Sequence, residues 1–142
     1  MRELFKYLST LGSKMNLNFS SCEFLKDVLI GFDTEKRKLL VVRGLYQDNR
    51  NEILIDLDEV KSCSLKKVYG PIKAGDLKKR RLDQLLEEIS LHFEFRGDKA
   101  ALEVPFYEYS ENETSNRIEL ANKARNWVLK LSDMLRYRKE VA

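Results

Sequence analysis

Histidine and cysteine, the residues on which many metal and nucleophilic sites depend, are almost absent from this chain. Its 142 residues include one histidine and two cysteines, and these cysteines, Cys22 and Cys63, do not form a Cys-x-x-Cys pair. A zinc site needs several such ligands brought close together. We therefore expect no metal site and no cofactor, and we expect the two cysteines to be reduced thiols.

Phosphate-binding loops and long apolar runs are also missing. The six glycines are scattered, and neither Gly-x-Gly-x-x-Gly nor Gly-Lys-Ser/Thr occurs. No stretch of the sequence approaches the roughly 20 apolar residues that span a bilayer. Charged residues interrupt the apolar N-terminal stretch, unlike in a signal peptide. We expect a cytoplasmic protein, or one at the cytoplasmic face of a membrane if an anchor precedes this chain.

The most regular pattern lies in the C-terminal part of the sequence. Apolar and polar residues alternate over 85–96, as in a strand with one face in water. A short turn and a second extended run at 101–109 follow, and Pro105 predicts that this strand is an edge strand or bulged. From Asn116 onward, apolar residues recur at spacings of three and four, which predicts an amphipathic helix.

The N-terminal part predicts a short amphipathic helix and then mainly strands. Two apolar runs joined by the charged turn 33–37 predict a hairpin, and Asp58-Glu59 predicts a corner. The full set of expected strands is 24–32, 38–45, 52–57, 60–69, 86–96 and 101–109, with helices at 2–13 and 116–138.

The fold class that these elements predict is α+β, mostly antiparallel β, in a single domain. We divide the chain, 1–142, into an N-terminal helix and loop (1–21), antiparallel strands (22–109) and a capping helix (116–138). Trp127 is expected in the core, anchoring that helix to the sheet. Tyr107 and Tyr109 are expected to do the same, although an aromatic pocket is the alternative.

Positive charge is concentrated in one segment. The net charge is +3, yet residues 66–81 hold seven basic residues and one acid, which leaves −3 for the rest. Such a segment attracts phosphate-bearing partners such as an anionic membrane or nucleic acid. Base-stacking aromatics are missing from it, which argues against nucleic acid, and a solvated loop remains the alternative. The candidate anion- or partner-binding residues are Lys66, Lys67, Lys73, Lys78, Lys79, Arg80 and Arg81.

The single histidine, His92, lies on the polar side of its strand, between Ser90 and Glu94. A general base there is conceivable because histidine titrates near neutrality, but an ordinary exposed strand residue is the favoured interpretation. A Cys–His pair would require a cysteine to meet His92, and nothing in the sequence arranges that. The acid pairs Asp56/Asp58 and Glu87/Glu88 could serve a metal or acid–base chemistry, but a strand-end corner explains the first pair. We expect no catalytic residues.

A run of antiparallel strands closed by one amphipathic helix with a tryptophan resembles the pleckstrin-homology-like superfold, and in particular its uncharacterised bacterial members. The segments that carry the resemblance are 38–42, 53–60, 89–95, 104–107 and 124–127. The resemblance implies a half-open barrel with the helix plugging one end, and binding of peptides, proteins or lipid headgroups instead of turnover.

This chain departs from the lipid-binding members of that superfold. Their basic ligands cluster between the first two strands, where this chain mixes Lys36, Arg37 and Lys38 with Asp33 and Glu35. The helix at 2–13 is extra, and is expected to pack on the barrel or to mediate self-association.

We therefore expect a non-catalytic binding or scaffolding module whose partner is a protein or peptide. Two alternatives remain open. One is an anionic-surface binder acting through residues 66–81, and the other is an enzyme of unfamiliar type that uses His92. The sequence does not define the ligand, the pathway or the oligomeric state.

Overall fold

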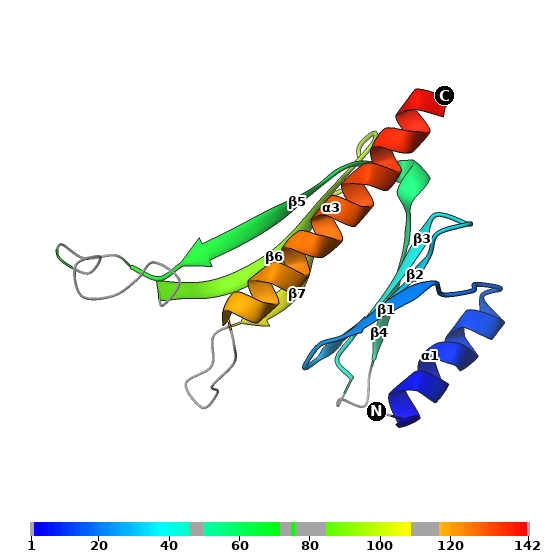
Figure 1. Cartoon of the computed structure of the whole chain (residues 1–142), viewed down its shortest axis with the longest axis horizontal. Coiled ribbons are helices and arrows are strands. Elements are labelled where there is room, and N and C mark those ends of the chain that lie inside the picture. The colour runs from blue at the N-terminus through cyan, green and yellow to red at the C-terminus, as the bar shows by residue number, and fades with distance from the viewer. Residues whose placement is uncertain (1, 46–49, 72–74, 76–84, 109–116, 142) are drawn as a thin grey trace. The chain divides into compact units, whose positions relative to one another are not determined.

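The computed structural model describes residues 2–45, 50–71, 75, 85–108 and 117–141 (Figure 1). These residues form an α+β structure with two antiparallel sheets, one of four strands and one of three, and two α-helices. The elements are α1 (Arg2–Lys14), β1 (Ser21–Phe24), β2 (Val28–Asp33), β3 (Lys38–Arg43), β4 (Asn51–Asp56), the 3-10 turn η1 (Leu57–Glu59), β5 (Val60–Tyr69), β6 (Leu86–Phe95), β7 (Leu102–Glu108) and α3 (Arg117–Val141).

The chain divides into two compact units, Met1–Glu59 and Val60–Ala142. The first unit contains α1 and the sheet ordered β1-β2-β3-β4, and the second contains the sheet ordered β5-β6-β7 and α3. Whether the chain is one domain stays a prediction.

The predicted strand at 24–32 is wrong in one respect, because it is two strands with a turn between them. β1 pairs antiparallel with β2, and the Leu25 N–H donates to the Val28 carbonyl at 2.8 Å to close the turn. Only two polar residues, Lys26 and Asp27, interrupt an otherwise apolar run. Two residues are enough to turn a hairpin, so the apolar run concealed a strand boundary.

The predicted hairpin across residues 33–37 is confirmed by the pairing of β2 with β3. Asp33 is only 2% exposed, and its carboxylate accepts from the backbone N–H groups of Asn18 at 2.9 Å and Lys36 at 3.0 Å. These two hydrogen bonds lower the pKa of Asp33. One carboxylate thereby joins the loop after α1 to the hairpin turn.

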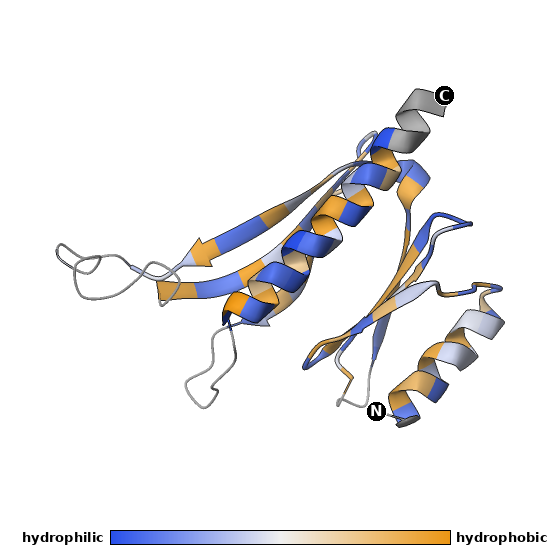
Figure 2. Cartoon of the chain, viewed as in Figure 1, coloured by the Kyte–Doolittle hydropathy of each residue, from blue (hydrophilic) through white to orange (hydrophobic). Residues whose placement is uncertain are grey.

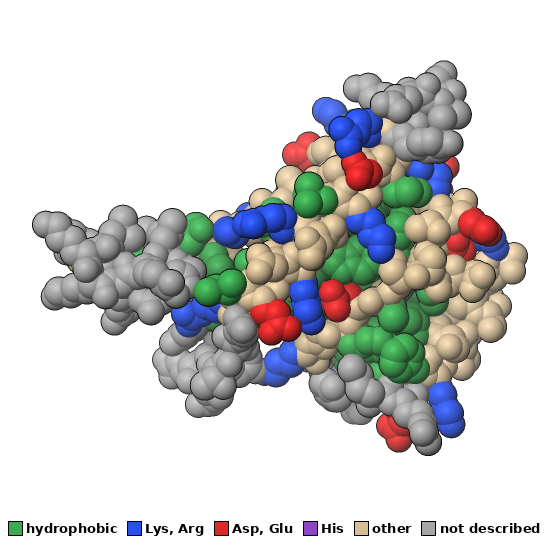
Figure 3. All heavy atoms as spheres, in the orientation of Figure 1, with side chains coloured by type: hydrophobic (Ala, Val, Ile, Leu, Met, Phe, Trp, Pro, Cys, Tyr) green, Lys and Arg blue, Asp and Glu red, His purple; other side chains and the backbone are tan. Residues whose placement is uncertain are grey.

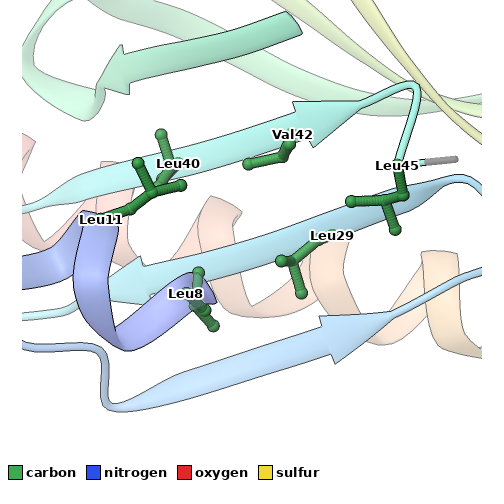
Figure 4. Packing of buried hydrophobic residues seen from close by; sticks show 6 residues of the cluster. All are labelled: Leu8, Leu11, Leu29, Leu40, Val42 and Leu45. Carbon is green, nitrogen blue, oxygen red and sulfur yellow. The ribbon is translucent and has the colours of Figure 1, made fainter. Parts of the chain in front are cut away.

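Helix α1 confirms the predicted helix at 2–13 and packs on one face of its own sheet. Figure 4 shows the cluster, in which Leu8 and Leu11 of the helix meet Leu29, Leu40, Val42 and Leu45. Gly31 of β2 allows the close approach, since a Cβ there would lie 2.9 Å from the Phe19 ring and 3.1 Å from Leu8.

The second unit has α3 lying across a three-stranded sheet (Figure 1). Apolar and polar residues alternate along β6, as Figure 2 shows, with Ile89, Leu91 and Phe93 fully buried. Ala124, Trp127 and Leu131 form the buried face of the helix, and Trp127 is 6% exposed. The predicted core role of Trp127 is therefore confirmed.

Irregularities in this sheet account for two exceptions in the sequence pattern. The register shifts where Val68 opposes Glu88 but Tyr69 opposes Leu86, so Glu87 is exposed although it lies among the apolar odd positions. A second shift lies beside Pro105, in β7, which is also an edge strand among the strands that the structure describes. Both features predicted from Pro105 are present.

The predicted α+β class with antiparallel strands is thus confirmed, while the described strands form two sheets with no closed barrel. Within the part of the chain that the structure describes, neither helix combines the length and apolar character needed to cross a membrane.

Candidate functional site

Two of the seven predicted partner-binding residues, Lys66 and Lys67, lie on β5. The other five fall outside the described residues: Lys73, Lys78, Lys79, Arg80 and Arg81. In the cross-strand register Lys66 opposes Ser90, on the polar face of the sheet, whereas Lys67 opposes Ile89, on the apolar face. The sheet thus separates two lysines that are adjacent in the sequence.

Strand β5 has an unpaired outer edge among the described residues, since it pairs with β6 alone. At ten residues it is longer than β1 with four and β4 with six, and it contains no proline, unlike β7. It carries Lys61, Lys66 and Lys67 and no acidic residue, and Leu65 and Tyr69 are only half-buried. This edge combines unpaired backbone groups, positive charge and accessible apolar side chains.

An ion pair spans the polar face of this sheet. Lys66 Nζ, on β5, donates to Glu103 Oε1, on β7, at 2.5 Å, and the two side chains are 47% and 35% exposed. The Lys66 ammonium lowers the pKa of Glu103, and the carboxylate in turn raises the pKa of Lys66. Each partner thus favours the charged form of the other.

His92 lies between two carboxylates on the same polar face. Its Nδ1 is 3.5 Å from Glu103 Oε1 and its Nε2 is 3.6 Å from Glu94 Oε1, with 25% of the side chain exposed. Nδ1 is buried and has no hydrogen-bond partner among the described residues, because a separation of 3.5 Å exceeds an ordinary hydrogen bond. His92, predicted to be an exposed strand residue, is instead half-buried within a charged cluster.

The described structure separates Cys63 from His92. Cys63 opposes Phe93 on the apolar face, where burial raises the pKa of its thiol to about 12. A thiol in that state supplies no thiolate nucleophile at neutral pH. Cys22 belongs to the first unit, and both cysteines are free thiols.

Three of the four acids in the two predicted pairs have hydrogen-bond partners in the described structure. Asp58 accepts from Arg37 Nε at 3.1 Å, and the Asp58 N–H donates to Asp56 Oδ1 at 3.0 Å, as expected of a strand-end corner. Glu88 accepts from Ser90 Oγ at 3.0 Å, whereas Glu87 is exposed. Among the residues described, no group of three or more His, Cys, Asp or Glu side chains could hold a metal ion.

Two basic residues between β2 and β3 make contacts within the first unit. Lys36 Nζ donates to the Asn16 carbonyl, and Arg37 pairs with Asp58.

Tyr107, in the second unit, is buried and accepts from Arg117 Nε at 2.8 Å, so it links β7 to α3. Tyr109 lies outside the described residues.

Figure 3 shows the side of the molecule on which α3 lies, and no histidine is in view there. The register places His92 on the face of its sheet opposite the buried Phe93. Sequence reasoning missed Glu103 as a partner of Lys66 and His92 because the three lie on three different strands, and only cross-strand register brings them together.

Comparisons with known protein families, with curated proteins and with solved structures each gave no match.

Proposed function

We propose that this chain is a pleckstrin-homology-like binding module that takes up an extended, acidic segment of a partner protein along the outer edge of β5. The segment would add a strand to the sheet β5-β6-β7, and no reaction would follow.

The order of elements supports the pleckstrin-homology-like part of the proposal. The described strands are antiparallel, and a C-terminal helix follows them with Trp127 buried. This is the order and the tryptophan position on which the resemblance depends. The helix α1 is an addition that packs on the first sheet.

The outer edge of β5 is the observation that carries the proposal. An edge strand presents a row of backbone N–H and C=O groups that an extended peptide can pair with, and alternate side chains then determine specificity. The three lysines of β5, with no acid among them, favour an acidic partner. Half-buried Leu65 and Tyr69 lie on the same face of the sheet as Lys67 and provide apolar contacts on either side of it.

The positive charge also suits a second candidate, an anionic membrane surface. Lysines near such a surface contribute about 1 kcal/mol each, and salt screens the attraction. The two candidates differ in geometry, because a membrane does not need the backbone of β5 and an added strand does.

The experiment measures binding of a fluorescent peptide of alternating valine and glutamate by anisotropy. We expect binding to the wild-type chain and about ten-fold weaker binding to the double variant Lys61→Glu/Lys67→Glu, because two of the three lysine charges of β5 are reversed. Lys6→Glu, an exposed lysine on α1 of the first unit, is the matched control and should bind like wild type.

Two further arms separate the candidates. N-methylation of alternate peptide bonds should abolish binding, because it removes the donors that pair with a strand edge. Equal binding of the N-methylated peptide, or binding only to phosphatidylserine vesicles, would contradict strand addition.

A further inference from the structure

We propose that His92 is a proton-operated switch for the β5 edge: a proton added to its imidazole draws Glu103 away from Lys66, and the released ammonium of Lys66 then binds the acidic partner segment. This inference rests on the proposed function, since it concerns the regulation of the same strand.

The geometry places two nitrogen atoms near one carboxylate oxygen. Lys66 Nζ lies 2.5 Å from Glu103 Oε1, and His92 Nδ1 lies 3.5 Å from the same oxygen. A neutral imidazole has one N–H, whereas a protonated imidazole donates from both nitrogens. Once Nδ1 carries a proton and the ring a positive charge, it competes with Lys66 for Glu103 and repels the lysine ammonium.

The buried Nδ1 has no hydrogen-bond partner among the described residues, which is unusual for a buried polar atom. Protonation would give it one, because a small approach of Glu103 closes the 3.5 Å gap. Nε2 faces Glu94 Oε1 at 3.6 Å, so a carboxylate is near each nitrogen of the charged ring.

All three strands contribute groups to this cluster. β5 contributes Lys66, and its uncharged Ser64 lies opposite His92. β7 contributes Glu103, and β6 contributes Glu94, two residues after His92. Glu88 lies farther along the same face of β6 and is hydrogen-bonded to Ser90.

The described charged groups of this cluster are one histidine, one lysine and the carboxylates of Glu94 and Glu103. Histidine is the side chain whose ordinary titration falls between about pH 5 and 8. The pKa of Lys66 is raised by Glu103, and the pKa of Glu103 is lowered by Lys66, so this pair stays ionised over the same range. A change of pH across that range therefore tests the proposed switch.

The first test measures the affinity of the valine–glutamate peptide at about pH 8 and about pH 5.5. We expect about five-fold tighter binding of wild type at the lower pH, the low end of allosteric coupling. His92→Gln should show the same affinity at both pH values. Glu103→Gln should bind tightly at both, because Lys66 no longer has a charged partner.

The second test needs no ligand. The side-chain NMR signals of Lys66 should shift between the two pH values in wild type and should not shift in His92→Gln. Unchanged Lys66 signals in wild type, or the same shift in His92→Gln, would overturn the switch. Peptide binding that is real but equal at both pH values would also overturn it, whereas a lack of binding at either pH by wild type and Glu103→Gln would overturn the proposed function itself.

Discussion

Asp33 shows how one buried carboxylate can hold a polar loop in place. Its two backbone hydrogen bonds connect the segment after α1 to the β2–β3 turn. Hydrogen bonds to a charged group contribute about 1.5–3 kcal/mol. The sequence indicates a charged turn at this place, but not that one of its acids is buried, because burial depends on the loop that folds over it.

We predict that Asp33→Ala lowers the free energy of unfolding by about 1.5–3 kcal/mol at neutral pH, measured by urea denaturation. The pKa of Asp33 is lowered from its ordinary value of 3.8, so the stabilisation is present above that value and is lost as the pH falls through the folded-state pKa. The difference between wild type and variant should therefore shrink in acid. A difference that stays constant down to strongly acidic pH would contradict this role.

Trp127 and Leu129 are matched tests of the helix face, because they are two residues apart and 6% and 60% exposed. Trp127→Ala should lower the free energy of unfolding by about 3–5 kcal/mol, owing to the cavity that it leaves. Leu129→Ala should change it by less than about 0.5 kcal/mol. Equal losses in thermal or urea unfolding would show that the face of α3 is misassigned.

At the scale of elements, the packing of α1 depends on the absence of a side chain at Gly31. We predict that Gly31→Ala costs about 1–3 kcal/mol, as overpacking does, and that it increases amide hydrogen exchange in α1 more than in α3. Phe19→Leu in the same background should recover part of the loss, because the nearest atom to the added Cβ belongs to Phe19. Unchanged exchange in α1 would mean that the helix does not depend on this contact.

The elements that sequence periodicity predicted well are those with one wet face. β6 and α3 alternate between apolar and polar residues at the periods of a strand and a helix. The sequence did not predict β1 as a separate strand. Because β2 is buried at all six positions, no alternation of apolar and polar residues showed where β1 ended and β2 began. The two polar residues within the apolar run, Lys26 and Asp27, were the sequence signal for a turn.

At the scale of the whole molecule, the candidate site could be predicted only in part. The basic character of β5 is visible in the sequence, whereas the separation of Lys66 from Lys67 and the pairing of Lys66 with Glu103 follow from register across three strands. The sequence also does not indicate that His92 lies between two carboxylates, because one of them, Glu103, is on another strand.

The most direct test of the account is to locate the valine–glutamate peptide by NMR on the full chain. We predict intermolecular NOEs between the peptide backbone and β5, spaced along the strand as in a sheet. We also predict that these NOEs disappear in Lys61→Glu/Lys67→Glu. NOEs that involve only α1 and the sheet β1-β2-β3-β4, or binding that the double variant retains in full, would contradict the claim that β5 is the docking strand.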